Sequence, residues 1–191
     1  MTDGGRRSAR SAATRERLVA ATAELIAELG WGNVSTRRVA ERAGVNPGLI
    51  HYHVSSIDEL RRAAAVQGVL AFFQGPIQEA LTEVDPYAAV AGLLAALSPA
   101  DPRDPHLLLL YESLVAAGRD EQLRRQIAPL LAELRRLLRD WLTDHLVPEP
   151  DAVAVTITAA IDGYLLQRAL DPSLPPGPLI TGLSRLFRLA P

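Results

Sequence analysis

The chain has 191 residues, of which 48% are hydrophobic and 22% are charged, a balance that is typical of a folded globular protein and excludes a disordered or fibrous one. It contains no cysteine, which excludes disulfides, cysteine nucleophiles and thiolate metal sites. The net charge of −2 conceals an uneven distribution, because residues 1–62 carry ten arginines against seven acids and residues 63–191 carry ten against fifteen. The basic amino end predicts an anionic partner there.

No charged and then apolar leader opens the sequence. The longest apolar runs, residues 88–97 and 152–161, have about half of the roughly 20 residues that a bilayer span requires. We therefore expect a cytoplasmic protein that makes no membrane contact.

The first predicted element is preceded by a basic segment. Residues 1–13 contain two glycines and three arginines without apolar periodicity, which predicts a basic flexible arm. From Thr14, an expected N-cap, apolar residues recur at helical spacing as far as Leu29. Gly30 is expected to end this first helix.

Two short helices are predicted next, with a tight turn between them. The second helix is expected to begin after the N-cap Ser35 and to end at Gly44. Asn46 is expected to cap a third helix, which has Pro47 in its first turn and ends near His53. Three short helices of this kind, the last two joined by a glycine turn, form a helix-turn-helix.

A long helix is expected to leave this region. Ser56 and Glu59 form a capping-box pattern at its start, and Pro76 is expected to break or restart it. Proline and glycine then divide the sequence into further helices, and no segment shows the alternation of a strand. The expected ranges are 76–84, 86–97, 105–117, 120–146, 151–170 and 178–189.

The region from Thr14 onward resembles the DNA-binding region of TetR-family transcriptional regulators. The resemblance is carried by the Gly-Trp-Gly corner at residues 30–32, by Ser35-Thr36-Arg37, by Ala40, Ala43, Gly44 and Val45, and by Tyr52-His53. It implies an all-α fold in which an N-terminal three-helix DNA-binding domain, residues 14–60, is joined by a long helix to a larger helical ligand-binding and dimerisation domain, residues 61–191. It also implies a regulator and not an enzyme.

The resemblance assigns DNA contacts to individual positions. Thr36 matches a phosphate-binding position, and Arg37 matches one that reaches a phosphate or a base. Asn46 suits adenine, while Pro47 and Leu49 offer apolar contact to thymine methyls. The expected DNA-binding residues are therefore Thr36, Arg37, Asn46, Pro47, Gly48, Leu49, His51, Tyr52 and His53. The family often has an aromatic residue where Val54 stands and a phosphate-binding group where Ile57 stands. Arg6, Arg7, Arg10 and Arg15 are candidates to compensate by lying along or in the minor groove.

The carboxyl-terminal region implies a dimer. Residues 151–171 resemble the helix before the last one in many family members, including members similar to betaine-responsive repressors. Small residues there allow a second helix to approach closely, and with the final helix they are expected to form a four-helix bundle across a two-fold axis. The expected interface residues are Thr158, Asp162, Gly163, Leu166, Leu183 and Phe187. The alternative is that these residues only close the core of one chain.

The central helices are expected to hold the pocket of a small-molecule inducer, because their leucines are interspersed with isolated polar and aromatic groups. The candidate lining residues are Phe72, Phe73, Tyr111, Glu112, Trp141 and His145. No cofactor is expected, and no metal site, since His51 and His53 lie on different faces of a helix.

The leading hypothesis is a homodimeric repressor that a small molecule releases from a palindromic DNA operator. One alternative is an all-helical small-molecule-binding protein or enzyme with a vestigial DNA-binding domain, although the sequence offers no nucleophile–base pair or phosphate loop. Another is an architectural DNA-binding protein without ligand control. The ligand and the operator are not encoded in any motif.

Overall fold

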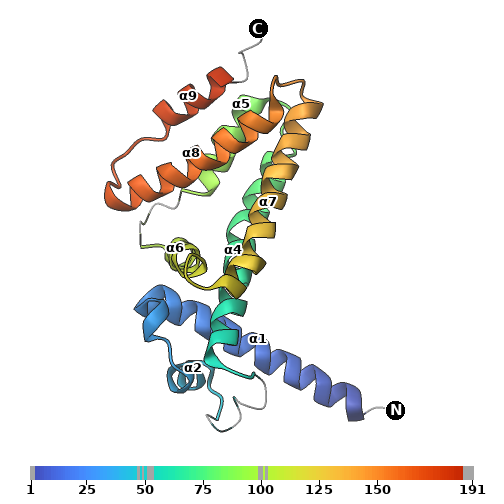
Figure 1. Cartoon of the computed structure of the whole chain (residues 1–191), viewed down its shortest axis with the longest axis vertical. Helices are drawn as coiled ribbons and strands as arrows, with labels where there is room; N and C mark the ends of the chain where they lie inside the picture. Colours follow the sequence, from blue (N-terminus) through green and yellow to red (C-terminus); the bar gives the residue numbers. More distant parts are fainter. Residues whose placement is uncertain are drawn as a thin grey trace. The chain divides into compact units, whose positions relative to one another are not determined.

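The computed structural model describes residues 3–46, 48, 50, 54–98, 101 and 103–186, and the regular structure of these residues is helical throughout, as predicted (Figure 1). The chain divides into two compact units. The amino unit contains residues 1–69 and 105–125, and the carboxyl unit contains residues 70–104 and 126–191. The functional boundary expected after residue 60 stays a prediction, because these units are defined by contacts and not by roles.

Helix α1 covers Asp3–Leu29, so helical structure begins well before Thr14 and the expected N-cap there is wrong. Thr14 instead donates its hydroxyl to the carbonyl of Arg10 at 2.9 Å, one turn earlier in the same helix. Alanine and arginine dominate residues 9–13 and are strong helix formers, and extending an existing helix carries no nucleation cost. Residues 3–13 are thus helical and not irregular, while their role as a basic arm stays a prediction.

Helix α1 ends where the sequence predicts. Gly30 has a φ of 82°, a left-handed conformation that glycine adopts without strain. A short 3₁₀ helix, η1 (Trp31–Asn33), follows.

Helix α2 (Thr36–Ala43) has both of its predicted ends. The Ser35 hydroxyl accepts a hydrogen bond from the backbone N–H of Arg38 at 3.4 Å. At the other end, Gly44 has a φ of 62°, and the N–H groups of Gly44 and Val45 donate to the carbonyls of Glu41 and Ala40. This pair of bonds is a Schellman motif. It fixes the direction in which the chain leaves α2 toward Asn46.

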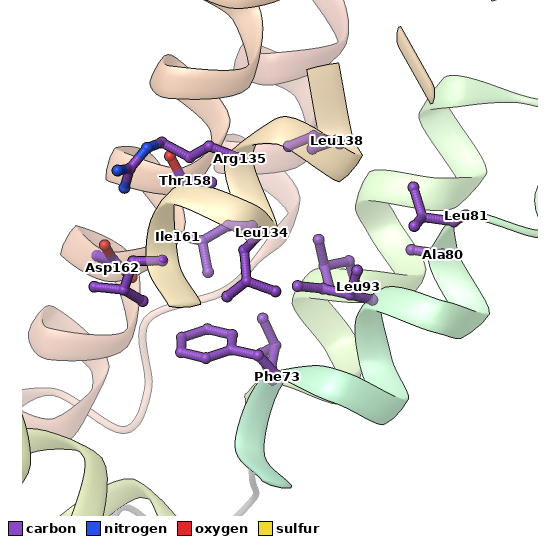
Figure 2. A pocket seen from close by; sticks show the side chains of 13 residues that line it. Phe73, Ala80, Leu81, Leu93, Leu134, Arg135, Leu138, Thr158, Ile161 and Asp162 are labelled. Carbon is purple, nitrogen blue, oxygen red and sulfur yellow. The ribbon is translucent and has the colours of Figure 1, made fainter. Parts of the chain in front are cut away.

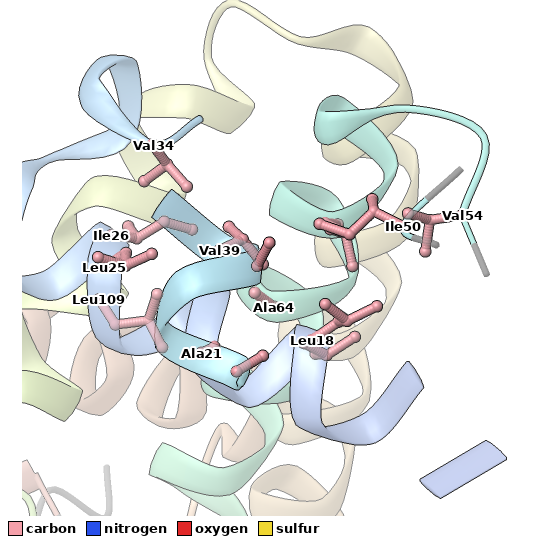
Figure 3. Close-up of a cluster of buried hydrophobic side chains, with 14 residues drawn as sticks. Leu18, Ala21, Leu25, Ile26, Val34, Val39, Ile50, Val54, Ala64 and Leu109 are labelled. Carbon is pink, nitrogen blue, oxygen red and sulfur yellow. The ribbon is translucent and has the colours of Figure 1, made fainter. Parts of the chain in front are cut away.

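The helix-turn-helix rests on one apolar core (Figure 3). Leu18 and Ile26 from α1, Val39 from α2, and Leu60 are completely buried. Leu109, which lies far along the sequence, is part of the same cluster. Burial of each large side chain stabilises the fold by about 1.5–3 kcal/mol, so this core holds α1 and α2 in a fixed arrangement.

The remaining helices confirm most of the expected ranges. They are α4 (Ile57–Ala80), α5 (Pro86–Ala96), α6 (Pro105–Ala117), α7 (Glu121–Asp144), α8 (Pro150–Leu170) and α9 (Gly177–Leu186). The expected break at Pro76 is wrong, because α4 continues through it. An internal proline removes one hydrogen bond, and α4 tolerates that loss at Pro76. Side chains before and after Pro76 line one apolar cavity, which is described below.

Side-chain caps and prolines define the starts of these helices. Ser56 accepts from the N–H of Glu59 at 3.1 Å, and Glu59 in turn accepts from the N–H of Ser55 at 2.9 Å, close to the predicted capping box. Asp85 accepts from the first N–H groups of α5. No described helix combines the length and the apolar character needed to cross a membrane.

Gly68 allows a close approach between α4 and α6. A Cβ atom added at Gly68 would lie 2.3 Å from a methyl carbon of Leu109. We expect Gly68→Ala to lower the free energy of unfolding by about 1–2 kcal/mol, because overpacking outweighs the gain in helix propensity. Chemical denaturation measures the change. Adding Leu109→Ala to Gly68→Ala should cost less than the sum of the two single changes, and strict additivity would contradict the proposed clash.

Candidate DNA-binding surface and ligand cavity

The expected DNA contacts that the structure describes lie on α2 and on the turn after it. Thr36 is the first residue of α2 and is half-buried, whereas Arg37 is exposed. The guanidinium of Arg37 forms an ion pair with Glu41 on the next turn at 2.9 Å. This hydrogen bond raises the pKa of Arg37, which stays cationic. Because exposed pairs of this kind are weak, Arg37 can exchange Glu41 for a phosphate.

Asn46 is exposed and has a capping role in the structure. Its Oδ1 accepts a hydrogen bond from the N–H of Gly48 at 2.9 Å, and Gly48 and Ile50 are helical. Its side-chain amide nitrogen makes no hydrogen bond among the described residues and can donate to adenine N7, while adenine recognition would also need Oδ1 as an acceptor. Pro47, Leu49, His51, Tyr52 and His53 lie outside the described residues, so their roles stay predictions.

Two arginines that the sequence analysis did not assign hold the backbone at the two ends of α2. Arg17 of α1 donates to the carbonyl of Ala43 and, at 3.4 Å, to that of Gly44. Arg61 of α4 donates to the carbonyl of Val34. The last carbonyls of a helix lack partners within it, and Arg17 satisfies two of them. No local pattern identifies these contacts, because the partners are 26 to 27 residues apart in the sequence.

Arg15, proposed above as an extra DNA contact, is engaged within the protein. Its guanidinium forms an ion pair with Glu59 at 3.2 Å. The N–H and hydroxyl of Ser55, followed by Arg15, lower the pKa of Glu59, so the carboxylate is charged at neutral pH. A DNA contact by Arg15 would therefore have to compete with this pair.

Glu112, expected in the inducer pocket, belongs to the amino unit. Its Oε2 accepts the backbone N–H of Trp31 at 2.7 Å, and its carboxylate lies beside Gly30. The contact connects α6 to η1, the segment between the two helices of the DNA-binding core. Glu112 is thus a support for the Gly-Trp-Gly corner in the structure.

We expect Glu112→Ala to lower the free energy of unfolding by about 1–3 kcal/mol, because the half-buried Trp31 N–H loses its acceptor. Glu112→Gln keeps an acceptor oxygen and should cost less. Thermal denaturation followed by circular dichroism measures both variants. Equal losses for the two would show that the charge, and not the hydrogen bond, is what matters.

The carboxyl unit contains an apolar cavity. About 620 Å³ of space, which includes open solvent at its mouth, is free of protein atoms there. Most of its lining is aliphatic, and one aromatic ring, Phe73, stands at its edge (Figure 2). The apolar lining residues come from α4, the α5 region, α7 and α8: Phe73, Ile77, Ala80, Leu81, Leu93, Leu97, Leu131, Leu134, Leu138 and Ile161.

Three polar side chains line one end of this cavity. They are Arg135 from α7 and Thr158 and Asp162 from α8, and Figure 2 shows them on the side away from Leu81 and Leu93. Burial raises the pKa of Asp162, and the positive charge of Arg135 partly opposes this rise. The cavity therefore combines an extended apolar wall with one polar end, the arrangement that orients a small molecule.

The six candidate pocket residues lie in separate parts of the structure. Phe73 lines the cavity, and the ring of Phe72 packs edge-on against it at 5.1 Å between centroids. Trp141 is buried, and its ring lies tilted against the ring of His145 with 4.2 Å between the ring centroids. Tyr111 and Glu112 belong to the amino unit. Of these candidates, only Phe73 is among the described residues that line this cavity.

The expected dimer residues also separate into groups. Thr158 and Asp162 line the cavity, and Leu183 is 4% exposed within the single chain, which agrees with the alternative that it closes the core. Phe187 lies outside the described residues. Leu166 is 56% exposed and Leu170 is 84% exposed. The outer stripe of α8 is formed by Val155, Ala159, Gly163, Leu166 and Leu170, at spacings of three and four residues.

No group of three or more potential metal ligands occurs among the residues that the structure describes. The cavity residues that the sequence analysis did not predict, Arg135 above all, follow no motif. The spacing of Thr158 and Asp162, four residues apart on one helix, places them on one face. It does not show whether that face meets a cavity or a partner.

Two family models match the chain. Residues 18–64 match the model described as bacterial regulatory proteins, tetR family, and residues 84–189 match the tetracyclin repressor-like C-terminal domain. Among proteins with curated functions, the comparison found no match.

Solved structures of similar proteins cover nearly the whole chain. A putative transcriptional regulator from Streptomyces coelicolor A3(2) is 34% identical, with a TM-score of 0.70, over 91% of this chain and 98% of that one. A transcriptional regulator from Rhodococcus sp. Rha1 is 29% identical, with a TM-score of 0.72, over 92% and 94%. The multidrug binding protein EbrR, complexed with ethidium, is 26% identical, with a TM-score of 0.69, over 91% and 98%.

Proposed function

Because the chain belongs to the TetR family of bacterial regulators, we propose that it is a homodimeric repressor, released from a palindromic operator by a small-molecule inducer. Members of this family are DNA-binding transcriptional regulators and not enzymes. A protein that binds an operator acts where the chromosome lies, in the cytoplasm. The resemblance of residues 151–171 to betaine-responsive repressors stays a prediction.

The observation that carries the proposal is the turn at Gly44. The capped helix α2, the Schellman motif and the Arg17 contacts fix the backbone that leads into Asn46. In a helix-turn-helix, the helix after such a turn enters the major groove and its first residues reach base edges. The exposed positions of Arg37 and Asn46 support a contact with phosphate and with a base, respectively.

Selection from a pool of random DNA duplexes tests the DNA-binding part directly. We expect an enriched sequence with two half-sites whose centres are about 34 Å apart, one turn of B-DNA. Affinity should fall steeply as salt increases, because arginines displace counterions from phosphates. If the random pool yields no enriched sequence and the protein does not bind the DNA beside its own gene, the alternative of a vestigial DNA-binding domain is favoured.

The inducer part of the proposal rests on the apolar cavity in the carboxyl unit. It is supported by the similar protein EbrR, whose structures contain imidazole and ethidium. A ligand changes operator affinity only if it binds the DNA-bound and free conformations with different affinities. A small molecule that binds the protein yet leaves the operator complex unchanged would favour an architectural DNA-binding protein.

We expect Arg37→Ala to weaken operator binding about tenfold while the oligomeric state stays the same, because one phosphate contact is lost from each subunit. Fluorescence anisotropy with a labelled operator measures the affinity at several salt concentrations, and the dependence on salt should become shallower. Arg125→Ala is the matched control, since Arg125 is also exposed and paired with a glutamate on its own helix. Equal effects of the two substitutions would contradict a specific role for Arg37.

A further inference from the structure

We propose that the cavity takes a neutral amphipathic molecule whose polar end both accepts and donates a hydrogen bond, such as a long-chain alcohol, a phenol or a primary amide. In this proposal the polar end lies between Arg135 and Asp162 and the apolar body lies against Phe73 and the leucines. The inference rests on the proposed function of the cavity as an inducer site and names the chemical class of the inducer.

The first observation is that two opposite charges face the same cavity without meeting. Arg135 from α7 and Asp162 from α8 both line it. Neither makes a hydrogen bond or an ion pair with another residue in the part of the chain that the structure describes. They nevertheless influence each other electrostatically. A group inserted between them can therefore interact with both.

Arg135 differs in this respect from its neighbours on α7. Arg124, Arg125, Arg136 and Arg139 all pair with carboxylates. The positions three and four residues from Arg135 hold Leu131, Ala132, Leu138 and Arg139, so its own helix offers no acid within reach. Arg135 is half-buried, so a ligand at this end of the cavity can supply an acceptor that the helix of Arg135 does not.

Thr158 adds an acceptor at the same end. Its hydroxyl lies within 3.0 Å of the carbonyls of Ala154 and Val155, so its hydrogen is used within α8 while its oxygen can still accept. Thr158 precedes Asp162 by one helical turn. The polar end of the cavity thus presents one donor group, Arg135, and two acceptor groups.

The charges decide against an ionic ligand. A cationic head on Asp162 would also lie near Arg135, and an anionic head on Arg135 would also lie near Asp162. Asp162 is exposed and Arg135 is half-buried, so solvent screens such like-charge repulsion only in part, and the repulsion disfavours an ionic head. A hydroxyl or a primary amide accepts from Arg135 and donates to Asp162 without meeting a like charge.

Isothermal titration calorimetry on the full-length protein without DNA tests the inference, with ten-carbon probes that differ at one end. We expect 1-decanol and decanamide to bind about tenfold more tightly than 2-decanone, which only accepts, since one hydrogen bond is lost. Decanoate and decylammonium should also bind at least about tenfold more weakly, because each meets one like charge.

Substitutions separate this recognition from simple partition into an apolar cavity. Asp162→Asn should improve the binding of decanoate, and Arg135→Gln should improve the binding of decylammonium, each by about tenfold. Arg136→Gln is the matched control, because Arg136 neighbours Arg135 but is paired with Glu133 and Asp140. It should change neither preference.

The inference is overturned if decylammonium binds the unaltered protein most tightly, which would make Asp162 a cation site, or if decanoate does, which would make Arg135 an anion site. Equal affinities for all five probes would also overturn it. If a variant does not fold, the order of the probes on the unaltered protein decides. Neutral probes that bind in this order without releasing the operator would support the inference and contradict the proposed repressor function, so the two failures are distinguishable.

Discussion

Replacing Gly163 with leucine should convert the protein from a dimer into a monomer and lower its affinity for the operator by about a hundredfold or more. A Cβ atom at Gly163 would meet nothing within 4 Å in the single chain, and leucine is a better helix former than glycine. The chain itself should therefore accept the change. In the proposed dimer, however, the larger side chain would hold the two α8 helices apart.

A monomer is expected to bind the operator more weakly because it contacts only one half-site. In a dimer, binding of one half-site raises the effective concentration of the second recognition helix near its own half-site, an advantage of about 10²–10⁴. A monomer does not have this advantage. Sedimentation equilibrium measures the oligomeric state, fluorescence anisotropy measures the affinity, and circular dichroism shows whether the helices remain.

Gly92→Leu provides a matched control. Gly92 lies in α5 of the same unit, is exposed, and also has open space around its missing side chain. It should leave both the dimer and the operator affinity unchanged. If Gly163→Leu remains dimeric, the interface lies elsewhere on the surface, and the exposed stripe of α8 needs another explanation.

The elements that could be predicted from the sequence are those whose determinants are local. Ser35 and Gly44 bound α2 because the hydrogen bonds that they make span only a few residues. Asp85 and Pro86 start α5 for the same reason. The apolar spacing of α1 likewise predicts its buried face, on which Leu18, Ala21 and Leu25 are at most 4% exposed.

The start of α1 was not predictable in the same way. Two glycines and several arginines are typical of a mobile arm, yet a helix that is already formed over residues 14–29 extends through neighbouring alanines and arginines. Composition alone does not include this cooperative effect. The continuous helix through Pro76 also differs from the local signal, because a helix can tolerate an internal proline at the cost of one backbone hydrogen bond.

The roles of Glu112 and Asp162 depend on partners far away in the sequence. Glu112 accepts from the N–H of Trp31, 81 residues earlier, and nothing near Glu112 indicates that partner. The resemblance of the Asp162-Gly163 pair to a dimer-forming helix implies an interface role, which stays a prediction, and the structure shows that Asp162 also lines a cavity with Arg135. A helix presents several faces, and only the packing of other helices determines which face meets a cavity.

A second large effect is expected at Asp120, which caps the start of α7 and forms an ion pair with an arginine of α4. Its Oδ1 accepts from the N–H groups of Gln122 and Leu123 at 2.9 and 3.0 Å and so caps α7. Its Oδ2 accepts from Nε of Arg62 on α4 at 2.7 Å. The side chains of Arg62 and Asp120 are 23% and 25% exposed, so this ion pair is more protected from solvent than those on the surface.

We expect Asp120→Ala to lower the free energy of unfolding at pH 7 by about 2–4 kcal/mol. Loss of a helix cap costs about 1 kcal/mol, and leaving a partly buried arginine without its acceptor costs about 1–3 kcal/mol more. The melting temperature should fall by about 2–4 °C for each kcal/mol. Asp120→Asn keeps a capping oxygen but not the charge, and it should have an intermediate effect.

The effect should depend on pH with a definite sign. The hydrogen bond from the N–H of Leu123, followed by Arg62, lowers the pKa of Asp120 in the folded protein. The stabilisation is therefore present above the pKa of about 3.9 that an aspartate has in an unfolded chain, and it is lost as the pH falls through the lower folded value. Urea denaturation of the unaltered protein and of Asp120→Ala at pH 7 and pH 3 should show a difference that shrinks in acid. A difference that is the same at both values would mean that Asp120 contributes through packing and not through its charge.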